Sequence, residues 1–382
     1  MSSIQKTIIC IGGFKMPDKN AAAHRVLNDA KALKEYGYNT VFIDIDKNAD
    51  ANILNTLNVY SEFDTYSISN TRKRAVNIDD FKKIYDVYKN NVVGVIAYNY
   101  PSLALLKLSR FCKKNNIFIA GDVTEWYEAS GKNLLFRIIK KIDIDMRMKV
   151  IHPRLDGIIA ISNYLSEYYS KDTEVVRIPP LTDNSSEKCE KDNDLRSDNT
   201  LRIVYAGSPG YTKDKLNRII EGIYKCNYKK ILFIIIGITE KQFLEYYPEE
   251  KEILKKLGNN IIFKGRVSHD EVIENLNSSD YTLFYREETR LTKAGFPTKF
   301  SESISCGIPV ITNGSSDLSE YITGDRNGFL LSTEKFVEDL PELLDELTEG
   351  KIDKPTVDKD LFDYHNYVSK LGDFIKKIEY NI

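Results

Sequence analysis

Short apolar segments alternate with helical periodicity along the whole chain, and this alternation limits the folds that the chain can adopt. Apolar runs of about four to eight residues are typical of strands buried on both faces of a parallel sheet. The first half contains five such runs, at residues 6–12, 39–45, 92–97, 117–120 and 156–161. Helices between consecutive buried strands make βαβ units, so the pattern predicts an α/β fold with a parallel sheet.

The clearest helix is predicted over residues 21–36. Asn20 is a suitable N-cap, and Gly37 can adopt the left-handed conformation that ends a helix. The apolar stripe that should face the sheet comprises Ala22, Val26, Ala30 and Leu33. We expect the polar side chains between these positions to lie outside the stripe; they are His24, Asn28, Lys31 and Lys34.

A polar segment divides the chain into two series of strands. Residues 183–199 contain almost no apolar side chains, which is typical of a surface linker. Six further apolar runs follow, at residues 201–207, 231–237, 260–265, 280–285, 308–312 and 328–331. The predicted parts are a domain over 1–180, a linker over 181–200, a domain over 201–362, and a helix over 363–382 that could cross back to the first domain. Both domains should be doubly wound and Rossmann-like, with the ligand in the cleft between them.

Composition narrows the function classes. The net charge of −2 gives no general attraction to nucleic acid, although residues 1–178 hold 26 Lys and Arg against 20 Asp and Glu. No run of 18 apolar residues is present, so no segment is expected to span a membrane. The five cysteines lack a CxxC pair, and we expect Cys10 and Cys306 to be free thiols packed in apolar segments. These features predict a cytoplasmic protein.

Two loops that follow predicted strands are rich in glycine. Residues 12–26 do not match GxGxxG, but Asp44 and Asp46 end the next strand, so a nicotinamide-dependent dehydrogenase remains an alternative. In the second series, Gly207 and Ser208 open a loop whose backbone N–H groups could approach an anion, and Lys213 stands where a helix begins. A plain turn is the other interpretation of this loop.

Residues 286–307 combine basic side chains with a helix start. Arg286 follows a strand, and Pro297 fits the first position of a helix in which Phe300 and Ile304 face the core. The free N–H groups of such a helix start, next to Lys299 and Arg286, are suited to a diphosphate. Glu302 points away from the core and could accept hydrogen bonds from ribose hydroxyls. A solvent-exposed helix without a ligand is the alternative.

The segment 295–313, together with 316–322 and Asn327-Gly328, resembles retaining GT-B glycosyltransferases of glycosyltransferase family 4, the glycosyl transferases group 1. Residues 156–169 and 265–284 also resemble this family. The resemblance covers most of the chain and is stronger in the second half. It implies two Rossmann-like domains that face each other across a cleft. The second domain would hold a nucleotide-sugar donor, and the first would receive the acceptor.

The resemblance also assigns donor-binding residues. Lys213 matches the basic residue that meets the diphosphate, and Ser208 replaces the family's arginine, so Arg286 or Lys299 should supply the missing charge. The family's E-x7-E motif ends at Glu302, the ribose ligand, but its first glutamate is replaced by Ala294. The full set of donor-binding residues is then Gly207, Ser208, Lys213, Arg286, Gly295, Phe296, Pro297, Thr298, Lys299 and Glu302.

In the first domain, residues 121–128 follow a strand where the family places a polar residue near the donor sugar. Asp122 or Glu125 could be that residue, and Trp126 could stack on a sugar; a capped helix start with a packed Trp is the alternative. The catalytic candidates are therefore Asp122, Glu125, Lys213 and Arg286. The candidates on the acceptor side are Gly13, Asn20, His24 and Trp126, although a structural role is expected for His24.

Neither a metal nor another cofactor is expected. D-x-D matches at 44–46, 143–145 and 192–194 are explained by chance in a chain with this many acidic residues. A helix start with Lys and Arg can neutralise the diphosphate of a UDP- or GDP-linked sugar without a metal.

The segment 132–154 interleaves apolar residues with seven basic ones, which are Lys132, Arg137, Lys140, Lys141, Arg147, Lys149 and Arg154. This pattern predicts peripheral contact with an anionic membrane, at its inner face. Asp143 and Asp145 dilute the charge, and a solvated helix face is the alternative.

The resemblance as a whole implies transfer of a hexose, with retention of configuration, to a glycan or lipid-linked glycan in cell-surface polysaccharide biosynthesis. A nucleotide-sugar hydrolase or epimerase is an alternative with the same fold. A non-catalytic nucleotide-sugar-binding or scaffold protein is another, and Ala294 is the residue in its favour.

Overall fold

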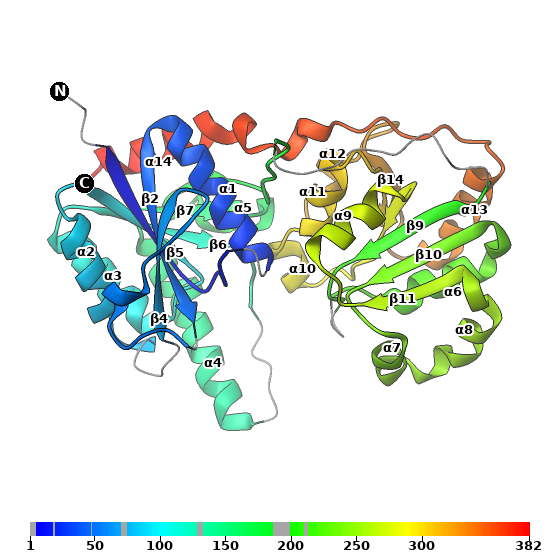
Figure 1. Cartoon of the computed structure of the whole chain (residues 1–382), viewed down its shortest axis with the longest axis horizontal. Helices are drawn as coiled ribbons and strands as arrows, with labels where there is room; N and C mark the ends of the chain where they lie inside the picture. Colours follow the sequence, from blue (N-terminus) through cyan, green and yellow to red (C-terminus); the bar gives the residue numbers. More distant parts are fainter. Residues whose placement is uncertain are drawn as a thin grey trace. The chain divides into compact units, whose positions relative to one another are not determined.

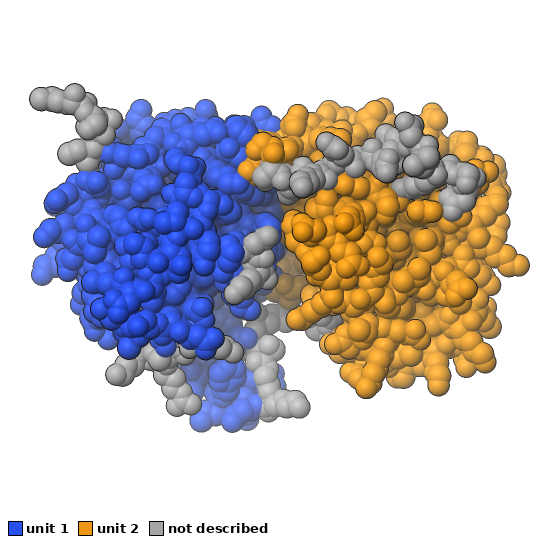
Figure 2. Space-filling view, in the orientation of Figure 1, with its two compact units in different colours: residues 1–182, 294–296, 364–382 blue, residues 183–293, 297–363 orange. Residues whose placement is uncertain are grey.

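The computed structural model describes residues 5–17, 20–46, 48–69, 75–127, 133–185, 199–209 and 213–382. The chain forms two compact units (Figure 2). The first unit comprises residues 1–182, 294–296 and 364–382, and the second comprises 183–293 and 297–363. Each unit has its own sheet covered by helices (Figure 1). The predicted α/β class with two Rossmann-like domains is therefore confirmed.

The first unit contains an eight-stranded sheet in the order β3-β4-β2-β1-β5-β6-β7-β8. All its pairs are parallel except the antiparallel pair β3–β4. Its strands are β1 (Lys6–Ile11), β2 (Tyr38–Asp46), β3 (Asn58–Tyr60), β4 (Phe63–Ser69), β5 (Val92–Tyr98), β6 (Phe118–Val123), β7 (Gly157–Ala160) and β8 (Glu174–Arg177). Its helices are α1 (Ala21–Tyr36), α2 (Asp79–Tyr88), α3 (Ser102–Lys114), α4 (Leu134–Met146), α5 (Asn163–Tyr169) and α14 (Val368–Tyr380).

Helix α1 begins and ends as predicted. The Asn20 side chain accepts hydrogen bonds from the backbone of Ala22 and Ala23, and Gly37 ends the helix with φ +115°. One expectation for this helix was wrong, because Asn28 is buried and its Nδ2 donates to the carbonyl of Leu181 at 2.7 Å. Segment 178–181 and helix α14 cover parts of α1 that an isolated amphipathic helix would leave to solvent.

The C-terminal helix α14 completes the core of the first unit (Figure 1). It packs against α1 and β8, and its apolar side chains Leu371, Phe374, Ile375 and Ile378 are buried. A Cβ on Gly372 would lie 2.0 Å from the ring of Tyr36, so only glycine permits this close helix–helix contact.

The second unit contains a six-stranded parallel sheet in the order β11-β10-β9-β12-β13-β14. Its strands are β9 (Leu201–Ala206), β10 (Ile231–Ile236), β11 (Ile261–Gly265), β12 (Tyr281–Leu283), β13 (Val310–Asn313) and β14 (Gly328–Leu331). Its helices are α6 (Leu216–Lys225), α7 (Glu240–Tyr246), α8 (Lys251–Leu257), α9 (His269–Asn277), α10 (Arg290–Ala294), α11 (Thr298–Ser305), α12 (Leu318–Tyr321) and α13 (Phe336–Thr348). The strand order reverses between β9 and β12, the point at which such sheets bind ligands.

Three further expectations concern the linker, the cysteines and membrane spans. Residues 186–198 of the predicted linker lie outside the described residues. Cys10 is a buried free thiol as expected, but the expectation for Cys306 was wrong, since Cys306 is disulfide-bonded. None of the helices in the described ranges has the length and hydropathy needed to cross a bilayer.

Candidate functional site

The candidate site lies in the second unit, at the carboxyl ends of β9 and β12. Three glycines follow or end neighbouring strands there, Gly207, Gly237 and Gly265, and all three have positive φ. A Cβ on Gly237 would lie 2.0 Å from the carbonyl oxygen of Gly207, and one on Gly207 would lie 3.1 Å from Cε of Lys299. Side chains at these positions would fill the space that the loops and Lys299 use, so glycine is required at this edge of the sheet.

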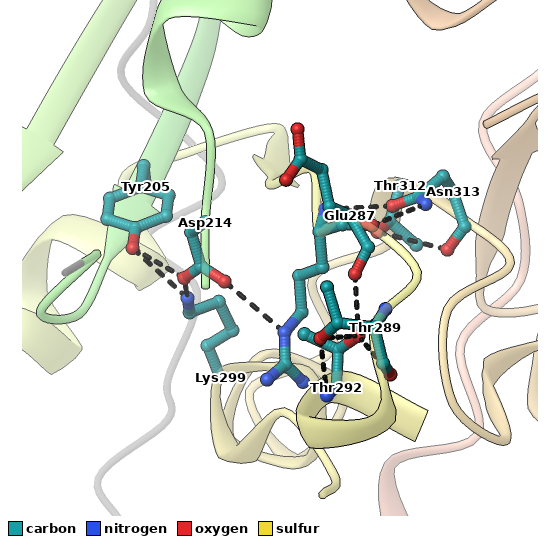
Figure 3. A network of polar contacts seen from close by, with 9 residues as sticks. Tyr205, Asp214, Glu287, Thr289, Thr292, Lys299, Thr312 and Asn313 are labelled. Atoms are coloured by element: carbon teal, nitrogen blue, oxygen red, sulfur yellow. Dashed lines mark hydrogen bonds and ion pairs between the residues drawn. The ribbon is translucent and has the colours of Figure 1, made fainter. Parts of the chain in front are cut away.

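A buried carboxylate organises the polar groups of this edge (Figure 3). Oδ2 of Asp214 accepts hydrogen bonds from the hydroxyl of Tyr205, at 2.7 Å, and from Nζ of Lys299. Oδ1 of Asp214 lies 3.3 Å from Nε of Arg286. We call these four residues, Tyr205, Asp214, Arg286 and Lys299, the Asp214 cluster. It joins a strand to three loops or helix starts in one network.

Lys299 lies in the first turn of α11 and folds back over the end of β9. Its Nζ donates to the Tyr205 hydroxyl at 3.2 Å and lies 4.4 Å from the centroid of the Tyr205 ring. The Phe284 ring centroid is 5.3 Å from the same nitrogen. The ammonium group is thus held between aromatic rings and one carboxylate, and its side chain is only 12% exposed.

Arg286 has unmet hydrogen-bonding capacity. Only 6% of the residue is exposed, and in the described part of the chain its buried Nη1 has no hydrogen-bond partner, while its Nε makes the ion pair with Asp214 without the geometry of a hydrogen bond. Its backbone is fixed on both sides by Asn313, whose Oδ1 accepts from the Arg286 N–H at 3.0 Å and whose Nδ2 donates to its carbonyl at 2.8 Å. A buried guanidinium with unpaired donors is costly, and an anionic ligand would satisfy it.

Hydrogen bonds from side chains hold the loop after Arg286, as Figure 3 also shows. Thr292 donates from Oγ1 to the carbonyl of Glu287 at 2.6 Å, and the Thr289 N–H donates to Thr292 Oγ1 at 2.8 Å. These bonds, together with those of Asn313, fix the backbone from which the Arg286 side chain extends.

The protonation states follow from burial and charge. Burial raises the pKa of Asp214, but Lys299 and Arg286 outweigh it and the net shift of that pKa is downward. Burial and the adjacent Arg286 lower the pKa of Lys299, Asp214 and Glu302 raise it, and the net shift of that pKa is downward. Burial and the adjacent Asp214 carboxylate raise the pKa of Tyr205, which therefore stays a neutral hydrogen-bond donor. With Lys299 protonated, the cluster has one positive charge in excess.

The other predicted donor residues occupy several environments. Helix α11 begins at Thr298, one residue later than predicted, so Pro297 is its N-cap rather than its first residue. Gly295 and Phe296 pack with the first unit, as does Ala294, whose carbonyl accepts from Ser162 Oγ at 2.8 Å. Ala294 is completely buried.

Glu302 and the loop after β9 complete the site. Glu302 lies one turn after Lys299, is half-buried, and its negative charge raises the pKa of Lys299. Phe300 and Ile304 are fully buried as predicted. Lys213 is half-buried and Ser208 is exposed. Asp214, which sequence reasoning missed, takes the central position; a carboxylate beside a predicted phosphate-binding lysine was the available signal.

In the first unit, the carboxylate of Asp122 is engaged by Arg25. Nε of Arg25 lies 3.0 and 3.1 Å from the two carboxylate oxygens, and Nη2 lies 2.8 Å from Oδ1. Arg25 also donates from Nη1 to the carbonyl of Ile178 at 3.0 Å. Asp122 is 1% exposed. The carboxylate therefore already has a bidentate partner, which sequence reasoning missed because Arg25 stands within an apolar helix pattern.

The remaining candidates of the first unit are more ordinary. Trp126 is 5% exposed and meets the Tyr168 ring edge-to-face at 5.0 Å, so its burial favours the packing interpretation over sugar stacking. Glu125 and His24 are half-buried, Gly13 is exposed, and Asn20 caps α1.

One of the two acids on which the dehydrogenase alternative depends, Asp44, is occupied. The Asp44 carboxylate accepts from the backbone N–H groups of Phe14 at 2.7 Å, Lys15 at 3.1 Å and Met16 at 2.8 Å. It therefore ties down the loop after β1 rather than facing a ribose. The described residues contain no group of three or more His, Cys, Asp or Glu side chains placed to hold a metal ion. Asp192 and Asp194 lie outside the described residues.

Comparisons with known proteins relate the second unit to a protein family and the whole chain to a fold. The family model described as "Glycosyl transferases group 1" matches residues 189–358, which include the whole Asp214 cluster. A comparison with curated protein sequences finds no match.

Many solved structures share the fold. They include the lipopolysaccharide outer core galactosyltransferase WaaB, with TM-score 0.59 and 16% identity over 98% of each chain. Anabaena HepE in complex with UDP and glucose has TM-score 0.61 and 14% identity over 98% of each chain. Sucrose-phosphate synthase from Thermosynechococcus elongatus has TM-score 0.62 and 13% identity over 98% of this chain and 94% of its own. At these identities the likeness establishes the fold, which is that of GT-B glycosyltransferases.

Proposed function

We propose that the chain is a retaining glycosyltransferase that moves a hexose from a UDP- or GDP-linked donor to a glycan or lipid-linked glycan. The observation that carries the proposal is the buried Arg286 guanidinium, whose Nη1 lacks a hydrogen-bond partner among the described residues, beside Lys299 at the strand-order switch point. The group 1 family match over residues 189–358 supports the same activity. HepE, a solved protein with this fold, binds UDP and glucose.

The donor diphosphate would bind against Arg286 and Lys299. A guanidinium supplies paired, directed donors to phosphate oxygens, and a lysine supplies a compact charge. As the sugar–phosphate bond breaks, negative charge grows on the leaving phosphate, and fixed cations in a water-poor site stabilise that charge. We propose that these two side chains, without a metal ion, neutralise the leaving group.

The ribose would be held by Glu302, whose half-buried carboxylate lies one turn after Lys299. In the first unit, the engagement of Asp122 by Arg25 leaves Glu125 as the better candidate for a polar contact with the transferred sugar. The acceptor hydroxyl would attack the anomeric carbon of the donor sugar on the same face from which the diphosphate leaves. The leaving phosphate would take the proton of that hydroxyl.

The activity is tested by incubating the purified chain with UDP- and GDP-linked hexoses, with and without a glycan or lipid-linked glycan acceptor. Transfer predicts release of nucleoside diphosphate that depends on the acceptor, and a product with the anomeric configuration of the donor. Release without acceptor would support the hydrolase. Donor binding without turnover would support the non-catalytic nucleotide-sugar binder.

We also propose that helix α4 contacts an anionic bilayer. Figure 1 shows α4 extending beyond the sheet of its own unit. Its apolar side chains are exposed; they are Leu134 at 68%, Leu135 at 65%, Phe136 at 57%, Ile138 at 47%, Ile139 at 58% and Ile142 at 60%. So contiguous an exposed apolar surface is unusual for a protein in water and marks an interaction site.

The charges of α4 are arranged to favour that contact. Asp143 accepts from the Ser102 backbone N–H at 2.8 Å, and Asp145 pairs with Lys149 at 2.7 Å. Both acids therefore have partners, and both lie in the last turn of α4. The outer half carries Arg137, Lys140 and Lys141, which would face anionic head groups while the apolar side chains enter the bilayer.

A further inference from the structure

We propose that Asp214 is a positioning residue that holds Lys299 and Arg286 together as one diphosphate-binding pair. The inference rests on the proposed function and adds to it a residue whose role is exerted through its two cationic neighbours. A carboxylate would repel a phosphate, so Asp214 cannot itself be a ligand of the diphosphate.

The geometry places one carboxylate between cations from different elements. Asp214 comes from the loop between β9 and α6, Arg286 follows β12, and Lys299 belongs to α11. Oδ2 serves Lys299 and Oδ1 faces Arg286, so each cation has its own oxygen. A backbone bridge between Asp214 and Arg286 and the hydrogen bond from the Lys215 N–H to the Tyr285 carbonyl join the two loops. The carboxylate therefore has a fixed place from which to orient both cations.

The hydroxyl of Tyr205 explains how the carboxylate keeps its own orientation. It donates to Oδ2 at 2.7 Å from a fully buried position on β9. Because strands hold side chains more precisely than loops do, the order of support runs from strand to carboxylate and from carboxylate to cations.

The charge count leaves the pair able to bind an anion. One carboxylate neutralises one of the two cations, and among the described residues the buried Nη1 of Arg286 has no hydrogen-bond partner. Without Asp214, two cations would be buried beside each other without a counter-ion, and mutual repulsion would separate them or deprotonate the lysine. Arginine does not lose its proton in proteins, so Lys299 is the group that would titrate.

The charged and titratable groups that face Lys299 are Asp214 and Tyr205 from the β9 side, Arg286 from the loop after β12, and Glu302 from its own helix. Burial and Arg286 lower the pKa of Lys299, whereas Asp214 and Glu302 raise it. Removal of the Asp214 charge leaves Glu302 as the only acid in this set. The variant Asp214→Asn should therefore convert Lys299 into a group that loses its proton at a lower pH.

The experiment measures the affinity of the full chain for inorganic pyrophosphate, UDP and GDP by calorimetry across a pH series. For the wild-type chain we expect binding to weaken only at high pH. For Asp214→Asn we expect weaker binding, with the pH midpoint of the loss moved down by about one unit or more. In the double variant Asp214→Asn with Lys299→Arg, the loss of binding at high pH should disappear, because the guanidinium stays charged. Asp345→Asn, which changes an acid that caps Asn227 elsewhere in the same unit, is the matched control.

A pH midpoint that is unchanged in Asp214→Asn would overturn the inference, as would a loss of affinity by the same factor at every pH. If Asp214→Asn does not fold, Asp214→Glu provides the test: it keeps the charge but displaces it, so we expect about tenfold weaker binding with the wild-type pH midpoint. Unchanged affinity in Asp214→Glu would contradict positioning. Failure of the wild-type chain to bind any of the three probes would instead contradict the proposed function.

Discussion

Arg25 and Asp122 form a buried ion pair that joins helix α1 to strand β6, with 2.8 Å between Nη2 and Oδ1. Both side chains are only 2% exposed. The variant Asp122→Asn leaves the guanidinium buried without its counter-charge, so we expect a loss of about 3–5 kcal/mol in the free energy of unfolding. Urea denaturation measures this loss. A variant of unchanged stability that has lost sugar transfer would instead show that Asp122 acts on the substrate.

The neighbouring Asp29 should make stability depend on pH. Burial raises its pKa from 3.8 to about 7, although Arg25 opposes that shift, and its Oδ1 has no hydrogen-bond partner in the described part of the chain. Between those two pH values the unfolded chain has released a proton that the folded chain retains, so stability falls as pH rises from about 4 to about 7. In Asp29→Asn this contribution disappears. We therefore expect the variant to gain stability relative to wild type on going from about pH 5 to pH 8, measured by urea denaturation; an identical difference at both values would contradict the assignment.

The Asp44 carboxylate should matter for the loop after β1 and not for nucleotide binding. Asp44→Ala removes the acceptor of three backbone N–H groups, which predicts a loss of about 1–3 kcal/mol in the free energy of unfolding. We expect the affinity for UDP or GDP to be unchanged, because Asp44 belongs to the first unit and the donor site to the second. Binding of NAD that is lost in this variant would revive the dehydrogenase alternative.

Glu302→Ala should distinguish the contribution of the ribose to nucleotide binding from that of the diphosphate. Loss of a charge-assisted hydrogen bond to ribose hydroxyls predicts weaker binding of the preferred nucleoside diphosphate by about 1–3 kcal/mol. The affinity for inorganic pyrophosphate, which has no ribose, should not fall. Calorimetry of both probes gives the answer, with the exposed Glu342→Ala on α13 as control. Equal nucleotide affinity in Glu302→Ala and wild type would remove Glu302 from the site.

Helix α4 gives a prediction about membranes. Ile139→Glu places a charge in the middle of the exposed apolar surface and should abolish co-sedimentation with vesicles that contain phosphatidylglycerol. Pyrophosphate binding should be retained, since α4 belongs to the first unit. Val87→Glu changes a side chain of similar exposure on α2 and should have no effect on sedimentation. If the wild-type chain fails to bind these vesicles, the proposed bilayer contact is wrong.

Much of the fold was predictable because buried strands and capped helices leave local patterns. Asn20 and Gly37 delimit α1 in the structure as they do in the sequence. Strands β3 and β4 were not predicted, because they lie at the edge of the sheet, where apolar and polar residues alternate and no continuous apolar run marks them. The burial of Asn28 was also unpredictable, because it depends on segment 178–181, which is distant in sequence.

The site was predictable only in part. The helix start with Lys299 and the arginine that follows β12 could be predicted from the positions of glycine and proline and from the order of the strands. The position of Asp214 could not be predicted in this way, because a pairing between residues 214, 286 and 299 requires three loops to meet at the switch point. Likewise, Trp126 and Asp122 looked available for a sugar, and only packing by Tyr168 and pairing by Arg25 revealed that both are occupied.

The most direct test of the central claim is calorimetric titration of the wild-type chain and Arg286→Met with UDP and GDP, first without metal and then with Mg²⁺. We expect the wild-type chain to bind one of the two nucleotides without metal. We expect Arg286→Met, which retains an unbranched side chain without the guanidinium, to lose about 2 kcal/mol or more of that binding free energy. Absence of binding by the wild-type chain to both nucleotides, or equal binding by Arg286→Met, would contradict the assignment of the Asp214 cluster as the diphosphate site.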